Sequence, residues 1–312
     1  MLMIPLSIDW NFDPQLFEIF GREIRWYGLL WVTGLIVAWY IVLRIFKHEQ
    51  LPEKWFESLT MYMLIGIIVG ARLGHCLFYD PEYFLAHPLE MILPISKNEY
   101  GNYVFSGYRG LASHGGVIGI IIAVWLYSRK ITKKSMLWTF DRVVVPAGFT
   151  AGMIRLGNLA NHEIYGGPTD LPWGFRFIEN LPHWEKGASA IYSVASHPTQ
   201  IYEAVCYFII FAITMWMYWK TNARKRQGLI IGVAMIGIFI ARFIIEFLKN
   251  VQEPFEISMR DNYGLVMGQL LSVPFIIWGV WLIWRAMKRK PEPEPVAQKT
   301  STDYSKNVKP KK

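Results

Sequence analysis

The sequence is poor in cysteine and in charge. Its 312 residues include only two cysteines, Cys76 and Cys206, and both lie within long apolar runs. Two cysteines so placed exclude a disulfide framework and a cysteine metal site, and apolar burial leaves a thiol unreactive. Charged residues make up only 18% of the chain, whereas hydrophobic residues make up 53%. Because soluble domains rarely have this composition, the sequence predicts a membrane protein.

Motifs for metals, nucleotides and nucleic acids are also missing. Asn161-His162-Glu163 is not a His-Glu-x-x-His helix, no carboxylate pair has metal-ligand spacing, and no nucleotide-binding loop occurs. We therefore expect no metal and no other cofactor. The formal net charge is +8, but the basic residues lie in short loops rather than on one folded surface. That distribution argues against a nucleic-acid partner.

What the sequence does contain is a series of apolar segments, each close to the ~20 residues that cross a bilayer. They predict an all-α polytopic membrane protein with about seven transmembrane helices. Residues 1–286 would form one transmembrane domain that includes a small extracytoplasmic head, residues 158–199. The expected spans are residues 26–46, 57–79, 110–127, 137–157, 200–219, 228–248 and 263–286.

Lysine and arginine residues indicate the orientation of these spans. They are concentrated after the first, third, fifth and seventh spans and are sparse in the alternate segments. By the positive-inside rule, the N-terminus lies outside and the C-terminus lies in the cytoplasm. Residues 287–312 are rich in Pro, Glu and Lys, and we expect them to form a disordered cytoplasmic tail.

Polar residues enter the apolar spans mainly at their outer ends. Helical spacing places Arg155 and Asn158 on one face of the fourth span, and Arg242 and Glu246 on one stripe of the sixth. Because buried charges need partners or substrates, the pattern predicts one polar pocket that opens outward. The residues expected at this depth are Tyr27, Arg72, His75, Tyr79, His114, Arg155, Asn158, Asn161, Glu163, Gln200, Tyr202, Glu203, Arg242, Glu246 and Lys249.

Single residues also allow plainer interpretations. His114 could be a structural group at a span end, and Arg242 could form an internal ion pair with Glu246 that has no chemical role. Gly115 and Gly119 have the small-xxx-small spacing that favours close packing of two helices over a ligand-binding loop. Three arginines, a histidine and two asparagines at one depth are harder to explain by packing alone.

The residue types of this pocket suit an anionic phospholipid. Arginine binds phosphate through two parallel hydrogen bonds, and histidine can act as a general base near neutral pH. Transfer of a phosphoryl or alkyl group from a lipid donor therefore fits better than work driven by ATP.

Ordered motifs run along most of the chain. They are Trp26-Tyr27-Gly28; Gly70-Ala71-Arg72-Leu73-Gly74; Tyr108-Arg109-Gly110-Leu111-Ala112-Ser113-His114-Gly115-Gly116 with Gly119; Arg155-Leu156-Gly157-Asn158 with Asn161, Glu163 and Gly166; His197-Pro198-Thr199-Gln200-Ile201-Tyr202-Glu203; Arg242-Phe243 with Glu246-Phe247; and Met267-Gly268-Gln269-Leu270-Leu271-Ser272. In residues and order these motifs resemble those of the bacterial prolipoprotein diacylglyceryl transferases. At Lys249 that family often has arginine, and lysine lacks the bidentate geometry of arginine.

The resemblance implies an enzyme that moves the diacylglyceryl group of phosphatidylglycerol to the lipobox cysteine of a preprolipoprotein and releases glycerol phosphate. It implies a multi-pass protein of the bacterial cytoplasmic membrane, with membrane lipid as its surroundings. Arg155 and Arg242 would stabilise the phosphate leaving group, and His114 would take the proton of the thiol. The residues expected to bind substrate are Tyr27, Arg72, Asn158, Asn161, Glu163, Gly166, Glu203 and Glu246.

Two other classes of protein stay open on the residues alone. A transporter or flippase of anionic phospholipid also places polar residues among its helices. Here the polar residues cluster on one side, and no inverted repeat is evident. A structural membrane protein that gathers partners through its head would leave the arginines unexplained.

Overall fold

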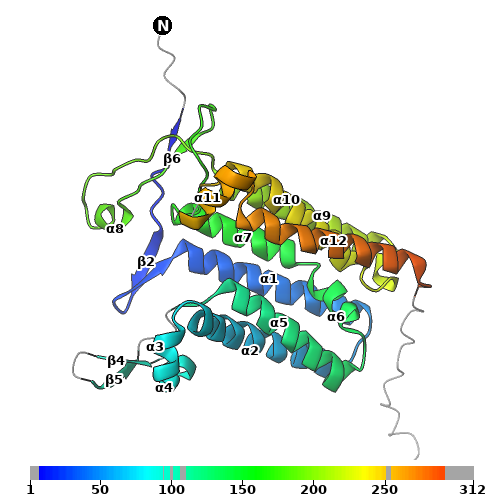
Figure 1. Cartoon of the computed structure of the whole chain (residues 1–312). Helices are drawn as coiled ribbons and strands as arrows, with labels where there is room; N and C mark the ends of the chain where they lie inside the picture. The colour runs from blue at the N-terminus through cyan, green and yellow to red at the C-terminus, as the bar shows by residue number, and fades with distance from the viewer. Residues whose placement is uncertain (1–6, 94, 99–100, 106–109, 251–253, 292–312) are drawn as a thin grey trace, which may run out of the picture.

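The computed structural model describes residues 7–93, 95–98, 101–105, 110–250 and 254–291. Long helices lie side by side in a bundle (Figure 1). Within the described residues, six helices are long and apolar enough to cross a membrane, or up to seven if one bent pair counts as a span. The chain is therefore a mostly helical, multi-pass membrane protein, in agreement with the number of spans expected from the sequence.

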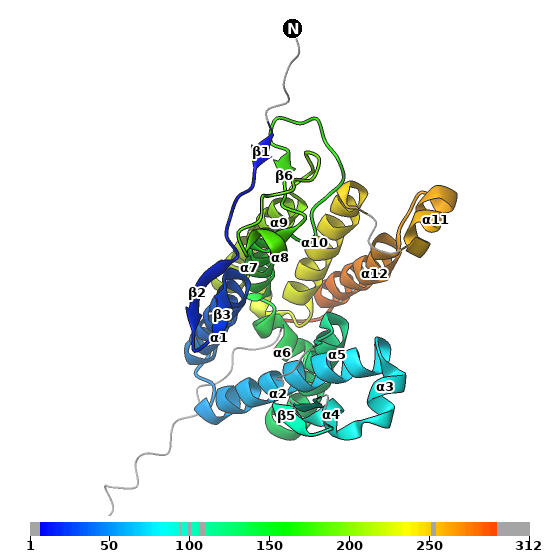
Figure 2. The same cartoon turned by 90° about the vertical axis from the view of Figure 1, so that its left-hand side faces the viewer.

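The bundle has two parts. α2 packs on α5, while α1 packs on α7, α7 on α9, α9 on α10 and α10 on α12. Seen from the end, the α2–α5 pair lies below the other long helices (Figure 2). The long helices are α1 (Trp26–His48), α2 (Glu53–Phe78), α5 (Ser113–Tyr127), α7 (Ala147–Ala160), α9 (Thr199–Lys220), α10 (Leu229–Ile245) and α12 (Met267–Lys288).

Three expected spans have other bounds or shapes in the structure. The third begins at Ser113 and continues past Tyr127 as a π-helix, η1 (Ser128–Thr132). The last does not begin at 263, because α11 (Pro254–Tyr263) ends there and Gly264 takes a positive φ of 68° before α12 starts. The fourth is broken, since α6 (Met136–Val143) and α7 meet at a bend of 51°.

Pro146 accounts for the position of this bend. It lacks a backbone N–H and cannot continue a helix from the preceding residues, but it is tolerated directly before the new helix that begins at Ala147. Because of the bend, α6 points away from the axis of α7 and contacts the start of α10. Its Asp141 accepts hydrogen bonds from the backbone N–H groups of Gly228, at 2.6 Å, and Ile231, at 2.9 Å, at the start of α10.

The expectation of an all-α fold is wrong in detail, because short strands lie at one end of the bundle. β1 (Ile8–Asp9) pairs in parallel with β6 (Phe175–Arg176). β2 (Gln15–Ile19) pairs antiparallel with β3 (Arg22–Arg25), and β4 (Ile95–Lys97) with β5 (Tyr103–Phe105). The short helices are α3 (Pro81–Ala86), α4 (Pro88–Ile92), α8 (Leu181–Trp184), η2 (Ala223–Lys225) and η3 (Glu246–Leu248).

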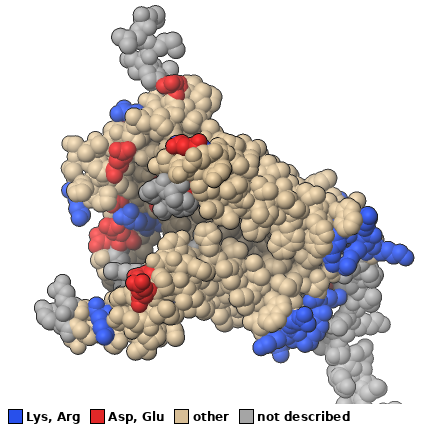
Figure 3. Space-filling model, viewed as in Figure 1, with Lys and Arg blue, Asp and Glu red and all other residues tan. Residues whose placement is uncertain are grey.

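We name the two ends of the bundle by their composition. The head end carries the short strands, and a small core of Leu159, Phe175 and Phe177 joins residues 158–199 to Trp10 near the N-terminus. At the opposite end, which we name the basic end, lysine and arginine side chains gather without visible acidic neighbours (Figure 3). Large apolar side chains between the two ends are exposed on the outer faces of the helices, as expected for surfaces that contact lipid.

Candidate active site

A carboxylate buried inside the head end organises the polar residues of the site. Glu203, on the second turn of α9, is fully buried. Its Oε1 lies 3.0 Å from Lys249 Nζ, and its Oε2 lies 2.9 Å from Arg155 Nε. The second approach is a charge contact rather than an aligned hydrogen bond, because Oε2 accepts none. One buried carboxylate thus holds two cations from different elements.

A chain of side-chain contacts continues from Arg155 to the surface. Arg155 Nη1 donates to Asn158 Oδ1 at 3.0 Å, across one turn of α7. Asn158 Nδ2 donates to Glu163 Oε1 at 2.9 Å, and Asn161 Nδ2 reaches the same oxygen at 3.3 Å. Gln200 Nε2 donates to the backbone carbonyl of Glu163 at 2.8 Å. The end of α7 and the start of α9 are therefore held as one polar unit.

His162 fixes the segment between these asparagines and glutamates. Its Nε2 lies 2.8 Å from the carbonyl of Phe12, and its Nδ1 accepts the N–H of Ile178 at 3.2 Å. Since a carbonyl can only accept, the proton sits on Nε2 and the ring is neutral. Burial lowers the pKa of His162, against smaller raising effects from the Phe12 hydrogen bond and from Glu185. The ring joins the N-terminal segment to the head.

Arg242 differs from the other cations of the site. It lies one turn before Glu246, is half-buried, and makes no side-chain hydrogen bond or ion pair with any residue that the structure describes. The ion pair with Glu246 that the sequence allowed is not formed there. Instead, Glu246 Oε2 lies 3.7 Å from Lys249. Arg242 is the site cation that has no carboxylate of its own in the described part of the chain.

Two glycines bring backbone segments together around this cluster. A Cβ on Gly166 would collide with the carbonyl oxygen of Leu248 and would lie 2.8 Å from His197 Cβ. This contact holds the segment that carries Lys249 against the head. A Cβ on Gly157 would lie 2.8 Å from the ring of Tyr27, so the first turn of α1 also reaches the site.

Buried oxygens that accept no hydrogen bond are concentrated in the same place, and two of them, Glu203 Oε2 and Glu246 Oε2, have only the charge contacts described above. Four buried side-chain oxygens here accept no hydrogen bond: those of Asn161 Oδ1, Gln200 Oε1, Glu203 Oε2 and Glu246 Oε2. Leaving a buried polar atom unpaired costs about 1–3 kcal/mol, so native structures contain few such atoms. Their convergence from several elements is typical of a site that receives a polar ligand.

Two expected site residues take no part in the contacts just described. Arg72 is buried, donates to the carbonyls of Glu90 and Met91, and lies over the ring of Phe84 at 4.7 Å. These contacts tie α4 to α2. His114 is exposed on the first turn of α5 and has no hydrogen-bond partner within the described ranges. Tyr108 and Arg109 of its motif lie outside the described residues.

The cluster is not arranged to hold a metal ion. Within the part of the chain that the structure describes, no three His, Cys, Asp or Glu side chains gather as potential metal ligands. Instead, the carboxylate of Glu203 lies between two cations, Arg155 and Lys249. Arginine, lysine and asparagine donors in one buried place suit an anionic oxygen group such as a phosphate.

The sequence of this chain matches one known protein family along most of its length. A family model for prolipoprotein diacylglyceryl transferase matches residues 14–285, which covers the bundle and the head together. The chain belongs to this family.

Individual members of the family match over nearly their full lengths. The phosphatidylglycerol–prolipoprotein diacylglyceryl transferase of Porphyromonas gingivalis is 52% identical over 308 residues, covering 96% of this chain and 100% of the relative. The proteins with the same name from Bacteroides fragilis and Chloroherpeton thalassium are 44% and 41% identical. They cover 91% and 90% of this chain, and 97% and 95% of their own lengths.

Two residues beside this cluster were not expected from the sequence. Tyr207 is buried one turn after Glu203 and lies close to Glu203, Arg155 and Arg242. Asn250 Nδ2 donates to the carbonyl of Gly166 at 2.9 Å. The four-residue spacing from Glu203 to Tyr207 was a usable signal, because it puts both side chains on one helical face. Asn250 had none, since its role depends on a contact between distant segments.

Proposed function

We propose that this chain transfers the diacylglyceryl group of phosphatidylglycerol to a prolipoprotein cysteine and releases glycerol phosphate. The names of its relatives supply both substrates. The observation that carries the proposal is the state of Arg242, a half-buried cation beside a preformed charged cluster, with no carboxylate partner among the residues that the structure describes. A cation at membrane depth needs a counter-charge, and the phosphate of the lipid provides one.

The chemistry is a displacement at carbon. The thiol sulfur forms a bond to the carbon of the diacylglyceryl unit that carries the phosphate, and the bond between that carbon and the phosphate ester oxygen breaks. The electron pair leaves on glycerol phosphate, and the thiol proton leaves to a base. Arg242 binds the phosphate, and Arg155, held by Glu203 and Asn158, supplies a second positive charge where negative charge grows. Such oriented groups typically contribute ~10²–10³ in rate each.

The other residues have supporting roles in this proposal. Glu203 orients Arg155 and Lys249, and Glu163 orients Asn158 and Asn161. Tyr27 and Glu246 border the lipid headgroup, and Gly166 holds the Lys249 segment in place. His114 takes the proton of the thiol, whose ordinary pKa of ~8.5 requires a base near neutral pH. Its exposure on α5 leaves it accessible to an incoming peptide.

The proposal includes an orientation in the bacterial cytoplasmic membrane. The head end faces outward, where lipobox-containing preprolipoproteins present their cysteine, and the basic end faces the cytoplasm. Lysine and arginine gathered at one end of the bundle support this direction (Figure 3). Residues 1–286 act as one catalytic domain with residues 158–199 as its head. The tail of residues 287–312 is cytoplasmic, and residues 292–312 lie outside those the structure describes.

A reconstituted transfer assay tests the proposal. Purified protein in phosphatidylglycerol vesicles, given a lipobox peptide, should yield a diacylglyceryl thioether peptide by mass spectrometry, together with free glycerol phosphate. A matched peptide with serine in place of cysteine should stay unmodified. Transbilayer movement of phosphatidylglycerol without modification of the cysteine peptide would support a flippase and would overturn the proposal.

A further inference from the structure

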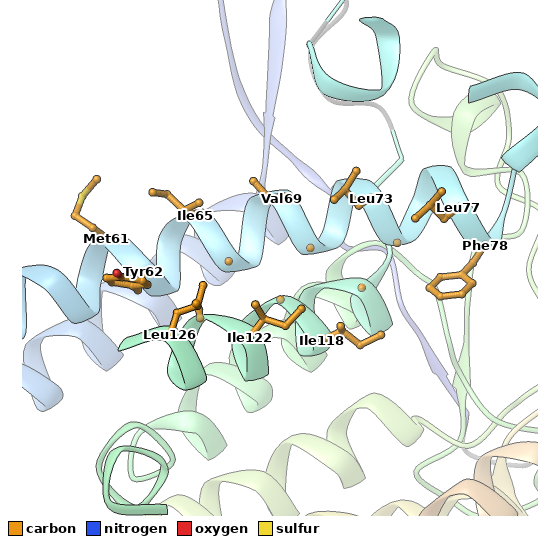
Figure 4. Close-up of a pocket in the computed structure, with 16 residues that line it drawn as sticks. Met61, Tyr62, Ile65, Val69, Leu73, Leu77, Phe78, Ile118, Ile122 and Leu126 are labelled. Carbon is orange, nitrogen blue, oxygen red and sulfur yellow. The ribbon is translucent and has the colours of Figure 1, made fainter. Parts of the chain in front are cut away.

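α2 and α5 touch through glycine backbone over much of their length. A Cβ on Gly70 would lie 2.7 Å from Gly119 Cα, and a Cβ on Gly74 would lie 2.5 Å from Gly115 Cα. Because no side chains separate the two helices, the larger residues beside the glycines stand apart and leave a groove of about 530 Å³. Figure 4 shows the two rows of apolar side chains that border it.

The groove has the length and chemistry of a fatty acyl chain. Its border residues on α2 run from Met61 to Leu77, which at 1.5 Å per residue is about 24 Å of a hydrocarbon core that is ~30 Å thick. Its lining is almost entirely apolar. Ile65 on α2 and Ile122 on α5 are about half exposed, so the groove opens toward lipid rather than toward the interior of the bundle.

A second cavity, also of about 530 Å³, lies where η1 meets α6 at the basic end. Arg129, Lys133 and Lys134 line it together with serine hydroxyls, and no carboxylate does. Its backbone is fixed in place: Lys133 has a φ of 56°, and its Nζ donates to the Arg129 carbonyl at 2.6 Å. Ser135 accepts the N–H of Leu137 at 3.1 Å and caps α6.

One helical stripe connects the groove to this basic cavity. Ile118 and Ile122 border the groove, and Trp125 and Arg129 line the cavity. The four residues follow one another at intervals of four, three and four positions, so they lie on one face of α5 and its continuation. Trp125 is half exposed, and an indole at this position suits the boundary between headgroups and acyl chains.

We propose that this composite site binds one anionic phospholipid. Arg129 and Lys134 contact its phosphate, and one acyl chain lies in the groove between α2 and α5. The site is at the opposite end of the bundle from Glu203, so a lipid held there is not the donor of the transfer reaction. Its role is structural, because it fills the groove that the glycine contacts leave open. This inference does not depend on the proposed function.

Native mass spectrometry of the full chain tests the phosphate contact. Protein is released from nanodiscs of phosphatidylcholine that contain phosphatidylserine as the anionic probe. We expect one retained phosphatidylserine, and about a tenfold loss of retention in the double variant Arg129→Gln, Lys134→Gln. The matched control is the double variant Lys47→Gln, Lys130→Gln, which removes two positive charges from exposed residues that do not line the cavity.

A second pair of variants tests the groove. Ile122→Trp places an indole in the groove and should displace the acyl chain, whereas Ile121→Trp adds the same ring on an exposed position outside it. Both positions are lipid-facing, so neither change disturbs the core. Equal retention in the charge variant and its control, equal retention in the two tryptophan variants, or displacement of the lipid by inorganic phosphate would each overturn the proposal.

Discussion

The cations of the site divide by their partners. Arg155 and Lys249 share the buried Glu203, whereas Arg242 has no carboxylate partner among the described residues. A cation that a protein anion already neutralises keeps its position, and one without an anion is available to a substrate. In the proposed mechanism, Glu203 is therefore the positioning residue of the site and Arg242 is the main phosphate ligand.

Replacing Glu203 tests this division. Glu203→Gln removes the negative charge, so that Arg155 loses its carboxylate and Lys249 keeps only the more distant Glu246. Breaking a buried ion pair in this way typically costs about 3–5 kcal/mol. We expect a loss of this order in the free energy of unfolding in detergent, together with a loss of transfer activity. Glu57→Gln, at an exposed position on α2, is the control and should change stability by less than about 0.5 kcal/mol. Equal stability of the two variants would refute the ion-triad interpretation.

Two adjacent glycines offer a test of the contact between the head and η3. A Cβ on Gly166 collides with the Leu248 carbonyl, whereas a Cβ on Gly167 would meet its nearest atom at 3.5 Å. Gly166→Ala should therefore displace Lys249 and abolish most of the transfer activity, while Gly167→Ala should keep it. Comparing kcat for the two variants checks this, and similar values would remove the role assigned to Gly166.

Contacts among the expected site residues could be predicted from the sequence where the residues share a helix or adjoining turns. Arg155, Asn158 and Glu163 were expected together from their spacing, and the structure brings them into contact. The spacing of Arg72 looked equally suitable, yet its guanidinium binds the carbonyls at the end of α4. A sequence pattern cannot distinguish these cases, because the choice depends on which loop folds back over the helix.

Among the elements, the close packing of α5 was predictable, although its partner helix was not, and the bend between α6 and α7 was also not predicted. The spacing of Gly115 and Gly119 predicted close helix packing, and the backbone contacts with α2 confirm it. For residues 137–157, the apolar average over the segment, which includes Asp141 and Arg142, concealed a bend of 51°. Pro146 was visible in the sequence, but proline also occurs inside membrane helices, as Pro274 does in α12.

The head segment should lose stability in mild acid through His162. Burial lowers its pKa below the ordinary value of ~6.5, so the unfolded chain binds a proton there more readily than the folded one. Above pH ~6.5, His162 is therefore neutral in both states and does not lower the free energy of unfolding of the head. As the pH falls below this value, the free energy of unfolding decreases. Protonation of Nδ1 also removes the acceptor for the N–H of Ile178.

Hydrogen exchange at pH 7.5 and 5.5 measures this effect. After correction for the intrinsic rate, the Ile178 amide should exchange faster at pH 5.5 in the wild type. The increase should disappear in His162→Gln and persist in His183→Gln, which changes an exposed histidine on α8. Persistence of the increase in His162→Gln would assign the pH response to another group.

At the scale of the whole molecule, the number of spans and their basic loops could be read from composition, because each depends on local averages. The small sheets at the head end could not, since β1 and β6 join residues more than 160 positions apart.

The proposed orientation predicts the accessibility of single cysteines in a background without Cys76 and Cys206. In intact bacterial cells, Glu179→Cys should react with an impermeant maleimide, and Lys130→Cys should react only after permeabilisation. The reverse result would invert the orientation.

The most direct test of the account is the single-turnover rate of glycerol phosphate release by Arg242→Gln. If Arg242 binds the phosphate of the lipid, the rate should fall by ~10²–10³. The melting temperature should stay that of the wild type, because Arg242 has no side-chain partner among the described residues. A variant that releases glycerol phosphate at the wild-type rate would contradict the central claim that this cluster carries out the transfer.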